Sequence, residues 1–289
     1  MNETADKLRP GLLRRTVAFL LVLLFAFPCS VQPADLQPKA NQAYDRYVEL
    51  TQAQVSLQLA KLDSYLWIDQ LAPDLRSADY QTLRNGGPVI ERAETLDDGK
   101  AISAPGALIH HWVGTVFVPG ATLDQTLAFM QDYDHKVEYF KPDILISKIL
   151  AHSGGDYTVH IRFYTKKVIT EVVDTDQEVH YQRIDATHAW SRSRTTRVQE
   201  VSNPGEKDER LEPQGHDHGF VWRMNTFWKF QEKDGGTYIE CQALSLSRDI
   251  PTGLGWVVGP FVQSVPRESL TFTLETARNA LLKKATSQK

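Results

Sequence analysis

Between residues 36 and 70 the apolar positions recur at steps of three and four, which predicts one long amphipathic helix. The apolar stripe consists of Tyr44, Val48, Thr51, Val55, Leu59, Leu62 and Leu66. A second, short helix is predicted after Pro73, with Ser77 as its N-cap and Gly86-Gly87 at its end. A stripe of this kind packs either on its own domain or on a partner, so the long helix is part of the core or a dimerising arm.

From residue 89 onward the pattern changes to alternation with period two, which is typical of strands. Strands are predicted at 89–95, 108–118, 144–150, 157–165, 168–173, 178–185, 189–201, 220–230 and 238–247. Thr122 and Gln125 match a capping box at the start of one short helix, and a second is predicted at 135–140. Residues 202–215 and 250–260 are rich in Gly and Pro and predict loops, and 266–284 predicts a C-terminal helix.

The first residues predict a targeting segment. Residues 1–15 carry four basic side chains, and residues 16–27 are almost entirely apolar. This is the layout of a signal peptide, and Pro28 stops the apolar run short of the ~20 residues that a spanning helix needs. We therefore expect a signal peptide over 1–34 and export to the periplasm or the cell exterior, with an uncleaved membrane anchor as the alternative.

Composition narrows the choice of partners. The net charge of -4 is mild, so we expect no nucleic-acid partner. Only Cys29 and Cys241 are present, and if Cys29 leaves with the signal peptide no internal disulfide can form. Six Trp, ten Tyr and twelve Phe supply enough apolar area for a core without one.

The last predicted hairpin pairs large aromatic residues with small ones. Alternation places Phe220, Trp222, Met224, Thr226, Trp228 and Phe230 on one face, and Ile239, Cys241, Ala243, Ser245 and Ser247 on one face of the partner strand. A sheet face that packs on a helix normally carries large branched residues. The small row therefore favours a cavity for a small molecule, unless the terminal helix lies closer to the sheet there.

A search for chemistry finds no catalytic or cofactor signature, so neither a cofactor nor a catalytic residue is expected. His216-Asp217-His218 is the best metal-like cluster but lacks further ligands, so no metal is expected. His110 and His111 point to opposite faces of a strand, and Cys241 is expected to be a small buried apolar residue.

Two further features concern a ligand. Arg192, Arg194 and Arg197 alternate after Trp190 and could pair with a carboxylate or phosphate, or be solvated charges on an exposed face. The loop at 250–261 carries Trp256 and Phe261 among glycines. It is expected to gate a cavity, to touch a membrane transiently, or simply to pack over the core.

The order of elements resembles that of the START-like (SRPBCC) helix-grip superfamily, which includes lipid-transfer, pollen-allergen and polyketide-cyclase-like proteins. The stretches that carry the resemblance are 110–144, 222–251 and 253–282. The resemblance implies an α+β fold, in which a curved antiparallel sheet wraps around a long C-terminal helix and encloses a cavity for an apolar molecule. We expect this helix-grip domain over 88–285, preceded by an added N-terminal helical segment over 35–87.

The leading hypothesis is an exported binding or transfer protein for a lipid or other hydrophobic small molecule. The expected ligand-binding residues are Trp190, Arg192, Trp222, Met224, Trp228, Cys241, Ala243, Ser245, Trp256 and Phe261. One alternative is a cyclase- or hydrolase-like enzyme in the same cavity, which would need inward titratable groups such as His160, Tyr181 or Glu240. Another is an interaction module acting through the N-terminal helix. The sequence leaves the oligomeric state open.

Overall fold

The computed structural model describes residues 34–166, 170–250 and 255–287, and leaves the side chains of 255–263 and 285–287 undescribed. The predicted signal peptide, apart from its last residue, therefore lies outside the described residues. None of the helices in the described part of the chain is both long enough and apolar enough to cross a membrane.

One large antiparallel sheet forms the centre of the fold. Its strands are β2 (Val89–Arg92), β5 (Ala107–Pro119), β6 (Ile144–Ser153), β7 (Asp156–Lys166), β8 (Thr170–Arg183), β9 (His188–Ser202), β10 (Arg210–Leu211), β12 (Arg223–Lys233) and β13 (Gly236–Arg248). The order is β2-β5-β13-β12-β9-β8-β7-β6, with β10 beside β9. Two small ladders lie apart from it, formed by β1 (Ala34–Asp35) with β11 (His216–Asp217) and by β3 (Leu96–Asp97) with β4 (Lys100–Ala101).

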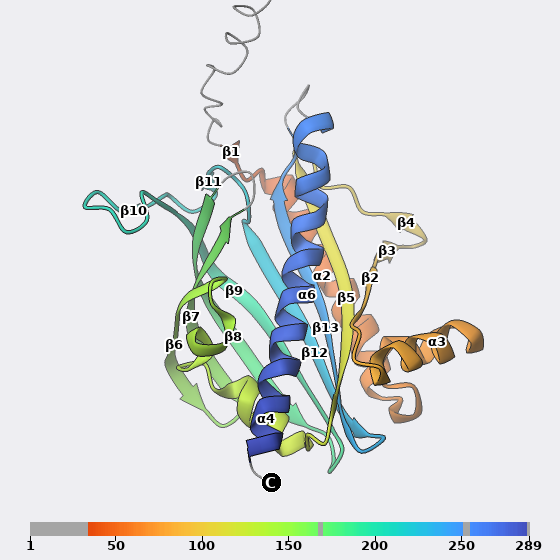
Figure 1. Ribbon diagram of the computed structural model, residues 1–289. Helices are drawn as coiled ribbons and strands as arrows, with labels where there is room; N and C mark the ends of the chain where they lie inside the picture. The colour runs from red at the N-terminus through yellow and green to blue at the C-terminus, as the bar shows by residue number, and fades with distance from the viewer. Residues whose placement is uncertain (1–33, 167–169, 251–254, 288–289) are drawn as a thin grey trace, which may run out of the picture. The chain divides into compact units, whose positions relative to one another are not determined.

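Helices lie on both faces of this sheet. They are α2 (Pro38–Leu59), the 3₁₀ turns η1 (Leu62–Ser64) and η2 (Trp67–Gln70), α3 (Pro73–Arg84), α4 (Leu123–Gln131), α5 (Lys136–Phe140) and α6 (Gly255–Ser287). Figure 1 shows α6 along the front of the curved sheet and α2 behind it. We call the face toward α6 concave and the face toward α2 convex. The predicted helix-grip fold, with its added N-terminal helical segment, is confirmed.

The amphipathic stripe of α2 packs on the sheet of its own chain. Tyr44, Thr51 and Val55 are buried, and Tyr44 belongs to an apolar cluster with Phe227 and Leu244 of the convex face. This contact occupies the apolar face that a partner-binding arm would need. The interaction-module hypothesis therefore loses the feature that motivated it.

The N-terminal helices are shorter than predicted. Helix α2 ends at Leu59 instead of continuing to residue 70, because the chain turns to bury Tyr65 and Leu66 completely against the sheet. Helix α3 begins at Pro73, where a proline costs no helical hydrogen bond, so the prediction of Ser77 as its N-cap is wrong.

Two predictions farther along the chain are also wrong. Strand β8 runs unbroken through residues 174–177, because Asp174 and Asp176 pair there with arginines of the neighbouring strands. The predicted loop at 250–260 is helical from Gly255 onward, since α6 continues through Pro260 and Pro266.

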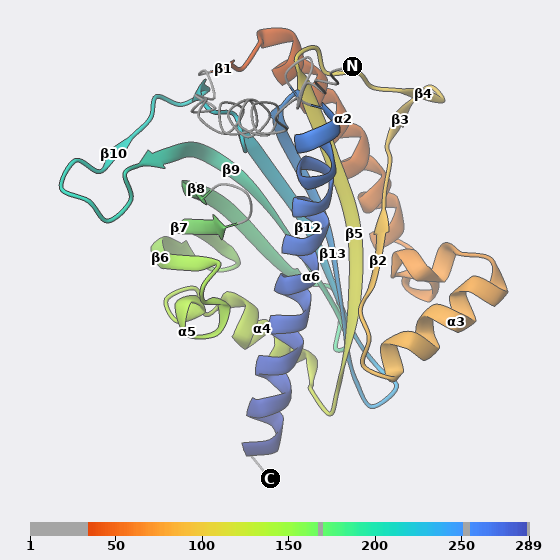
Figure 2. The ribbon, with the colours of Figure 1, turned by 45° about the horizontal axis from the view of Figure 1, so that its top comes forward.

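The capping box is confirmed in detail. The backbone N–H of Gln125 donates to Thr122 Oγ1 at 3.2 Å, and the backbone N–H of Thr122 donates to Gln125 Oε1 at 3.0 Å. Helix α4 therefore begins where the sequence predicts. Figure 2 shows α4 and α5 beside the C-terminal half of α6, where they close one end of the concave face.

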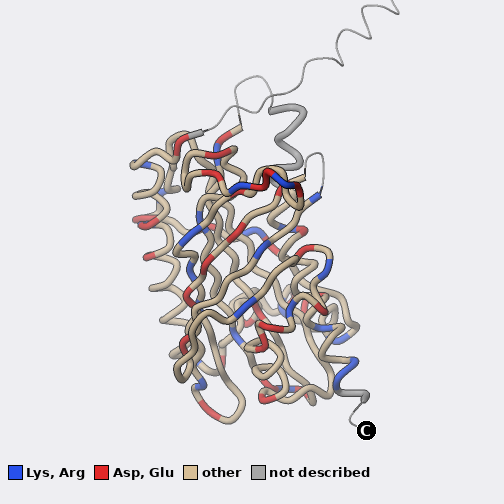
Figure 3. The backbone as a smooth tube through the Cα atoms, turned by 90° about the vertical axis from the view of Figure 1, so that its left-hand side faces the viewer, with Lys and Arg blue, Asp and Glu red and all other residues tan. Residues whose placement is uncertain are grey.

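Residues of both charge signs are mixed along the backbone. In the view of Figure 3, Lys and Arg are interspersed with Asp and Glu, and no face in that view has a single sign.

Candidate functional site

The strand register defines which side chains line the concave face. In the ladder between β12 and β13, Trp228 lies opposite Cys241, Thr226 opposite Ala243 and Met224 opposite Ser245. Cys241 belongs to the apolar cluster that also contains residues of α6, and Trp228 and Ala243 pack against that cluster. The sequence prediction that these small and large residues share one face is therefore correct.

One half of this face, the closed half, is filled. Phe230, Ile239 and Val116 are completely buried there, and Leu274 of α6 is buried against them. The other members of the same cluster include Leu127, Met130, Tyr133, Phe140, Ala277 and Leu281, contributed by α4, α5, their connection and the C-terminal half of α6. A guest has no room among these side chains, because protein interiors leave few voids.

The other half, the open half, is lined differently. Its wall side chains are small or polar for the most part, and all are partly buried: His110, Trp112, Ser193, Thr195, Met224, Thr226, Trp228, Ala243 and Ser245. Ala243 and Ser245 continue the row in which Ile239 and Cys241 are at most 1% exposed. Along this row, burial is complete up to Cys241, partial at Ala243 and Ser245, and close to complete again at Ser247, which is 5% exposed.

The polar groups of the open half satisfy one another. The hydroxyls of Ser193 and Thr226 are 2.7 Å apart, and Trp228 Nε1 donates to Thr226 Oγ1 at 3.0 Å. His110 Nε2 lies 2.9 Å from Ser247 Oγ. Burial lowers the pKa of His110 to about 4, so its ring is neutral at pH 7. The wall therefore carries no net charge here and suits a mainly apolar guest.

Helix α6 lies close to the sheet at Gly114 of β5. A β-carbon added at this glycine would lie 2.7 Å from Leu274 Cδ1 and 3.3 Å from Leu270 Cδ2. The absence of a side chain at Gly114 thus lets the helix lie against β5, at one side of the curved sheet. The strands β12, β9, β8 and β7 curl away from that line of contact (Figure 2).

Beyond the open half, three carboxyl groups gather at the end of the sheet. Burial, reinforced by the charges of Glu200 and Asp217, raises the pKa of Glu171 to about 8. Burial and the charge of Glu200 raise the pKa of Asp217 to about 6. Glu200 accepts from the backbone N–H of His218 at 3.0 Å. No local sequence pattern indicated this cluster, because its members come from β8, β9 and β11.

The structure does not bring all the predicted ligand residues together. Met224, Trp228, Cys241, Ala243 and Ser245 lie on the concave face, with Cys241 in the closed half. Trp256 and Phe261 belong to the segment whose side chains are not described. The structure places the remaining three, Trp190, Arg192 and Trp222, elsewhere.

Trp190 and Arg192 lie on the convex face. Arg192 is the register partner of Phe227, and Trp190 is the partner of Lys229, both of which face α2 and its extension. The prediction that Trp190 and Trp228 line one wall is wrong, because alternation along β9 sends Ser191 and Ser193 to the concave side instead.

Trp222 is also on the convex side. It is 3% exposed in the cluster that contains Tyr44 and Leu246, and its Nε1 donates to Asp217 Oδ1 at 2.9 Å. Strand β12 begins at Arg223, so Trp222 precedes the strand and does not follow its alternation. The prediction that Trp222 lines the cavity is therefore wrong.

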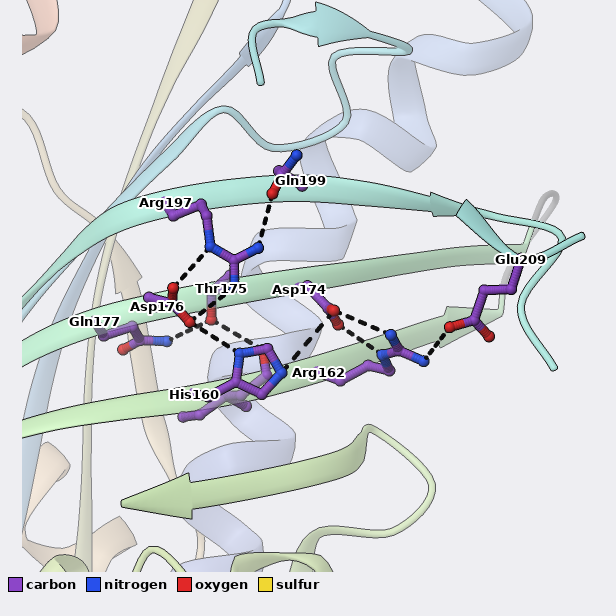
Figure 4. Close-up of polar contacts among 10 residues, drawn as sticks. His160, Arg162, Asp174, Thr175, Asp176, Gln177, Arg197, Gln199 and Glu209 are labelled. Carbon is purple, nitrogen blue, oxygen red and sulfur yellow. Dashed lines mark hydrogen bonds and ion pairs between the residues drawn. The ribbon is translucent and has the colours of Figure 1, made fainter. Parts of the chain in front are cut away.

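The candidates for catalysis do not converge. Tyr181 faces inward, with its hydroxyl 3.0 Å from that of Tyr133 in the closed half. His160 lies on the outer face, 2.9 Å from Asp176 Oδ1, within the network of cross-strand ion pairs in Figure 4. Glu240 is buried on the convex side against Lys229, 2.9 Å away. These positions do not form a shared acid–base site.

The metal-like cluster also separates. His216 contacts Asp35, whereas His218 Nδ1 lies 2.7 Å from Glu200 Oε2. Across the described residues, no group of three or more His, Cys, Asp or Glu side chains is arranged to hold a metal ion. His110 and His111 face opposite sides of β5 as predicted, since His110 contacts Ser247 and His111 Nδ1 lies 3.1 Å from the hydroxyl of Tyr47.

Comparisons with known proteins give structural likenesses only. No family model and no curated protein matches the chain. Among solved structures, the chain is similar to a STAR-related lipid transfer protein from Xanthomonas axonopodis, with 16% identity and a TM-score of 0.42 over 66% of this chain and 98% of that one.

Two further structures are similar at the same level. Human STARD10 has 9% identity and a TM-score of 0.40, covering 78% of this chain and 84% of its own. The Zhui aromatase/cyclase from a Streptomyces species has 14% identity and a TM-score of 0.40, covering 60% and 94%. These likenesses concern the fold alone.

Proposed function

We propose that this chain is an exported binding or transfer protein for a lipid or another hydrophobic small molecule, held between the open half of the concave face and α6. The observation that carries the proposal is the change along β13 from completely buried Ile239 and Cys241 to partly buried Ala243 and Ser245, before Ser247 at the end of the strand is again only 5% exposed. A sheet face under a helix is normally filled by its own large side chains. Here most of the wall side chains are small or polar, and the wall carries no net charge over the half where the guest is proposed to lie.

The proposed binding mechanism is burial of apolar surface. Each methylene of the guest that leaves water contributes roughly 0.8 kcal/mol. Trp228 and Met224 offer apolar contact, while the hydroxyls of Ser193 and Thr226 already satisfy each other and need no partner in the guest. Affinity then depends on the length of the apolar part more than on a specific hydrogen bond.

The test is direct detection of a guest. The mature protein is purified without detergent, its organic extract is analysed by mass spectrometry, and the stripped protein is titrated with fluorescent fatty acids and sterols. We expect a co-purifying apolar molecule and binding of at least one probe. Ala243→Leu, which fills the open half, is expected to weaken probe binding at least tenfold without lowering the unfolding midpoint.

Ala186→Leu is the matched control, because Ala186 is exposed in the turn between β8 and β9 and the substitution adds the same side-chain atoms. A protein that carries no guest and ignores every probe would contradict the proposal. So would equal binding by the Ala243→Leu and Ala186→Leu variants.

Export is a separate part of the proposal and has its own test. It rests on the basic residues of 1–15 and the apolar run at 16–27. We expect the full-length chain, expressed in a bacterial host, to be recovered from the periplasm or medium with a new N-terminus near residue 34. Retention of Met1 with recovery from the membrane fraction would support the anchored alternative, and recovery from the cytoplasm would contradict export.

A further inference from the structure

A cleft of about 130 Å³ lies on the convex face, on the opposite side of the sheet from the proposed cavity. Helix α2 forms one wall with Gln52 and Val55, and the sheet forms the other with Trp190, Arg192 and Phe227. Val55 and Phe227 are each 4% exposed, so the floor of the cleft is apolar. Trp190 and Arg192, which the sequence suggested as ligand residues, therefore meet at a different hollow.

Arg192 differs from the other arginines of its strand. Arg194 pairs with Glu178 at 2.7 Å, and Arg197 pairs with Asp176 through two nitrogens at 2.7 and 2.9 Å. Arg192 is exposed at the mouth of the cleft, and its guanidinium group makes no hydrogen bond or ion pair with any residue that the structure describes. A guanidinium group without a partner presents a planar fork of donors that matches a carboxylate.

The size of the cleft limits the body of the ligand. An apolar cavity of ~150 Å³ in a protein core takes one benzene molecule, so a volume near 130 Å³ suits a single aromatic ring or a short alkyl chain. The partly buried indole of Trp190 and the ring of Phe227 offer flat apolar contact to such a body. A long acyl chain has no room in this cleft.

We propose that the cleft between α2 and β9 binds a small monocarboxylate with an aromatic or short alkyl body. Arg192 pairs with the carboxylate at the mouth of the cleft, and the body contacts Trp190, Phe227 and Val55. This site is independent of the proposed function, because the sheet separates it from the open half of the concave face. Both sites can be filled at once.

The experiment compares an acid with its neutral analogue. Binding of 3-phenylpropanoate and of 3-phenylpropanamide is measured by calorimetry and by saturation-transfer NMR on the wild-type chain. The acid is expected to bind at least tenfold more tightly than the amide. Arg192→Gln is expected to reduce the affinity for the acid to that for the amide, and Arg192→Lys, which keeps the charge but loses the fork, is expected to give an intermediate affinity.

Arg194→Gln is the matched control, because it removes the same charge from the same strand at an arginine that already has a carboxylate partner. It is expected to leave binding of the acid within twofold of wild type. Equal affinity for acid and amide, or an equal loss in the Arg192→Gln and Arg194→Gln variants, would overturn the proposal. Ala243→Leu, on the concave face, is expected to leave binding of the acid unchanged, so failure of one site is distinguishable from failure of the other.

Discussion

The two faces of the strands β5, β13 and β12 are both covered by helical segments, but they are held by different kinds of contact. On the concave side, α6 meets the closed half through apolar side chains such as Leu274 and leaves the small residues of the open half partly exposed. On the convex side, the N-terminal segment is fastened by buried polar groups. The convex cover thus adds buried polar contacts to its apolar ones, whereas the concave cover leaves part of the sheet face only partly buried.

The convex contacts include buried polar groups that have defined partners. The Tyr44 hydroxyl donates to the carbonyl of Leu244 at 3.1 Å, and the Tyr65 hydroxyl donates to the carbonyl of Ala189 at 2.7 Å. Lys229 Nζ lies 2.9 Å from Glu240 Oε1 and also donates to the carbonyl of Tyr65. Such groups are costly to bury without their partners, so they fix the path of the N-terminal segment.

The largest effect is expected from breaking the buried ion pair. Lys229 and Glu240 are at most 1% exposed as side chains, so Glu240→Leu leaves a buried ammonium without its carboxylate. We expect the free energy of unfolding to fall by about 3–5 kcal/mol in urea denaturation.

The control for that variant is Glu178→Gln, which breaks an exposed ion pair with Arg194. It is expected to lower the free energy of unfolding by at most about 1 kcal/mol. The double variant Lys229→Met/Glu240→Leu is expected to recover part of the lost stability, and a Glu240→Leu protein as stable as wild type would refute the role given to the pair.

Substitutions at two positions of β12 test the contrast between the closed and the open half. Phe230 and Trp228 lie on the same face of β12 with ring centroids 6.3 Å apart, but Phe230 is completely buried and Trp228 is not. Phe230→Ala is expected to cost about 3–5 kcal/mol of unfolding free energy, because it leaves a cavity in the filled core.

Trp228→Ala is expected to lower the free energy of unfolding clearly less than Phe230→Ala does, although it removes a larger side chain. Its main effect is expected on probe binding, which should weaken more in the Trp228→Ala variant than it does in a destabilised but folded Phe230 variant such as Phe230→Leu. Equal loss of stability at the two positions would mean that the open half is packed like the closed half.

A smaller effect on the free energy of unfolding is expected when the pH is lowered, because of one histidine on the convex side. Burial lowers the pKa of His111 from 6.5 to about 4. Between these two pH values the unfolded chain binds a proton at His111 that the folded protein does not, so this group lowers stability as the pH falls from 6.5 to 4. The shift corresponds to at most about 3 kcal/mol.

The measurement compares urea denaturation of wild type and His111→Gln from pH 7 to pH 4. The difference in unfolding free energy is expected to shift in favour of the variant as the pH falls. Subtracting the variant removes the opposite contributions of Glu171 and Asp217, whose raised pKa values make the folded protein the better proton acceptor. A difference that stays constant across this range would show that His111 titrates equally in both states.

Much of the fold could be predicted because the relevant signals are local. The capping box of Thr122 and Gln125 fixes the start of α4, and alternation assigns Cys241, Ala243 and Ser245 to one face of β13. The errors occur where distant residues decide the conformation. Asp174 and Asp176 have the composition of a turn, yet arginines on β7 and β9 hold them in one continuous strand.

The candidate site was predicted only in part for the same reason. Alternation relates side chains within one strand, so it placed the last hairpin correctly. It cannot say which face of β9 turns toward α6, and Trp190 and Arg192 were therefore assigned to the wrong hollow. The carboxyl groups of Glu171, Glu200 and Asp217 gave no signal because they come together only through folding.

The sequence by itself determined the periods of its strands and helices, the presence of a C-terminal helix and the row of small residues on β13. These follow from backbone geometry and from side chains close together along the chain. Only the tertiary structure decided that Gly114 lets α6 lie against β5, that the N-terminal segment covers the convex face, and that the concave face has completely buried side chains over one half and partly buried ones over the other. These features depend on packing between elements far apart in sequence, and local patterns carry no information about such distances.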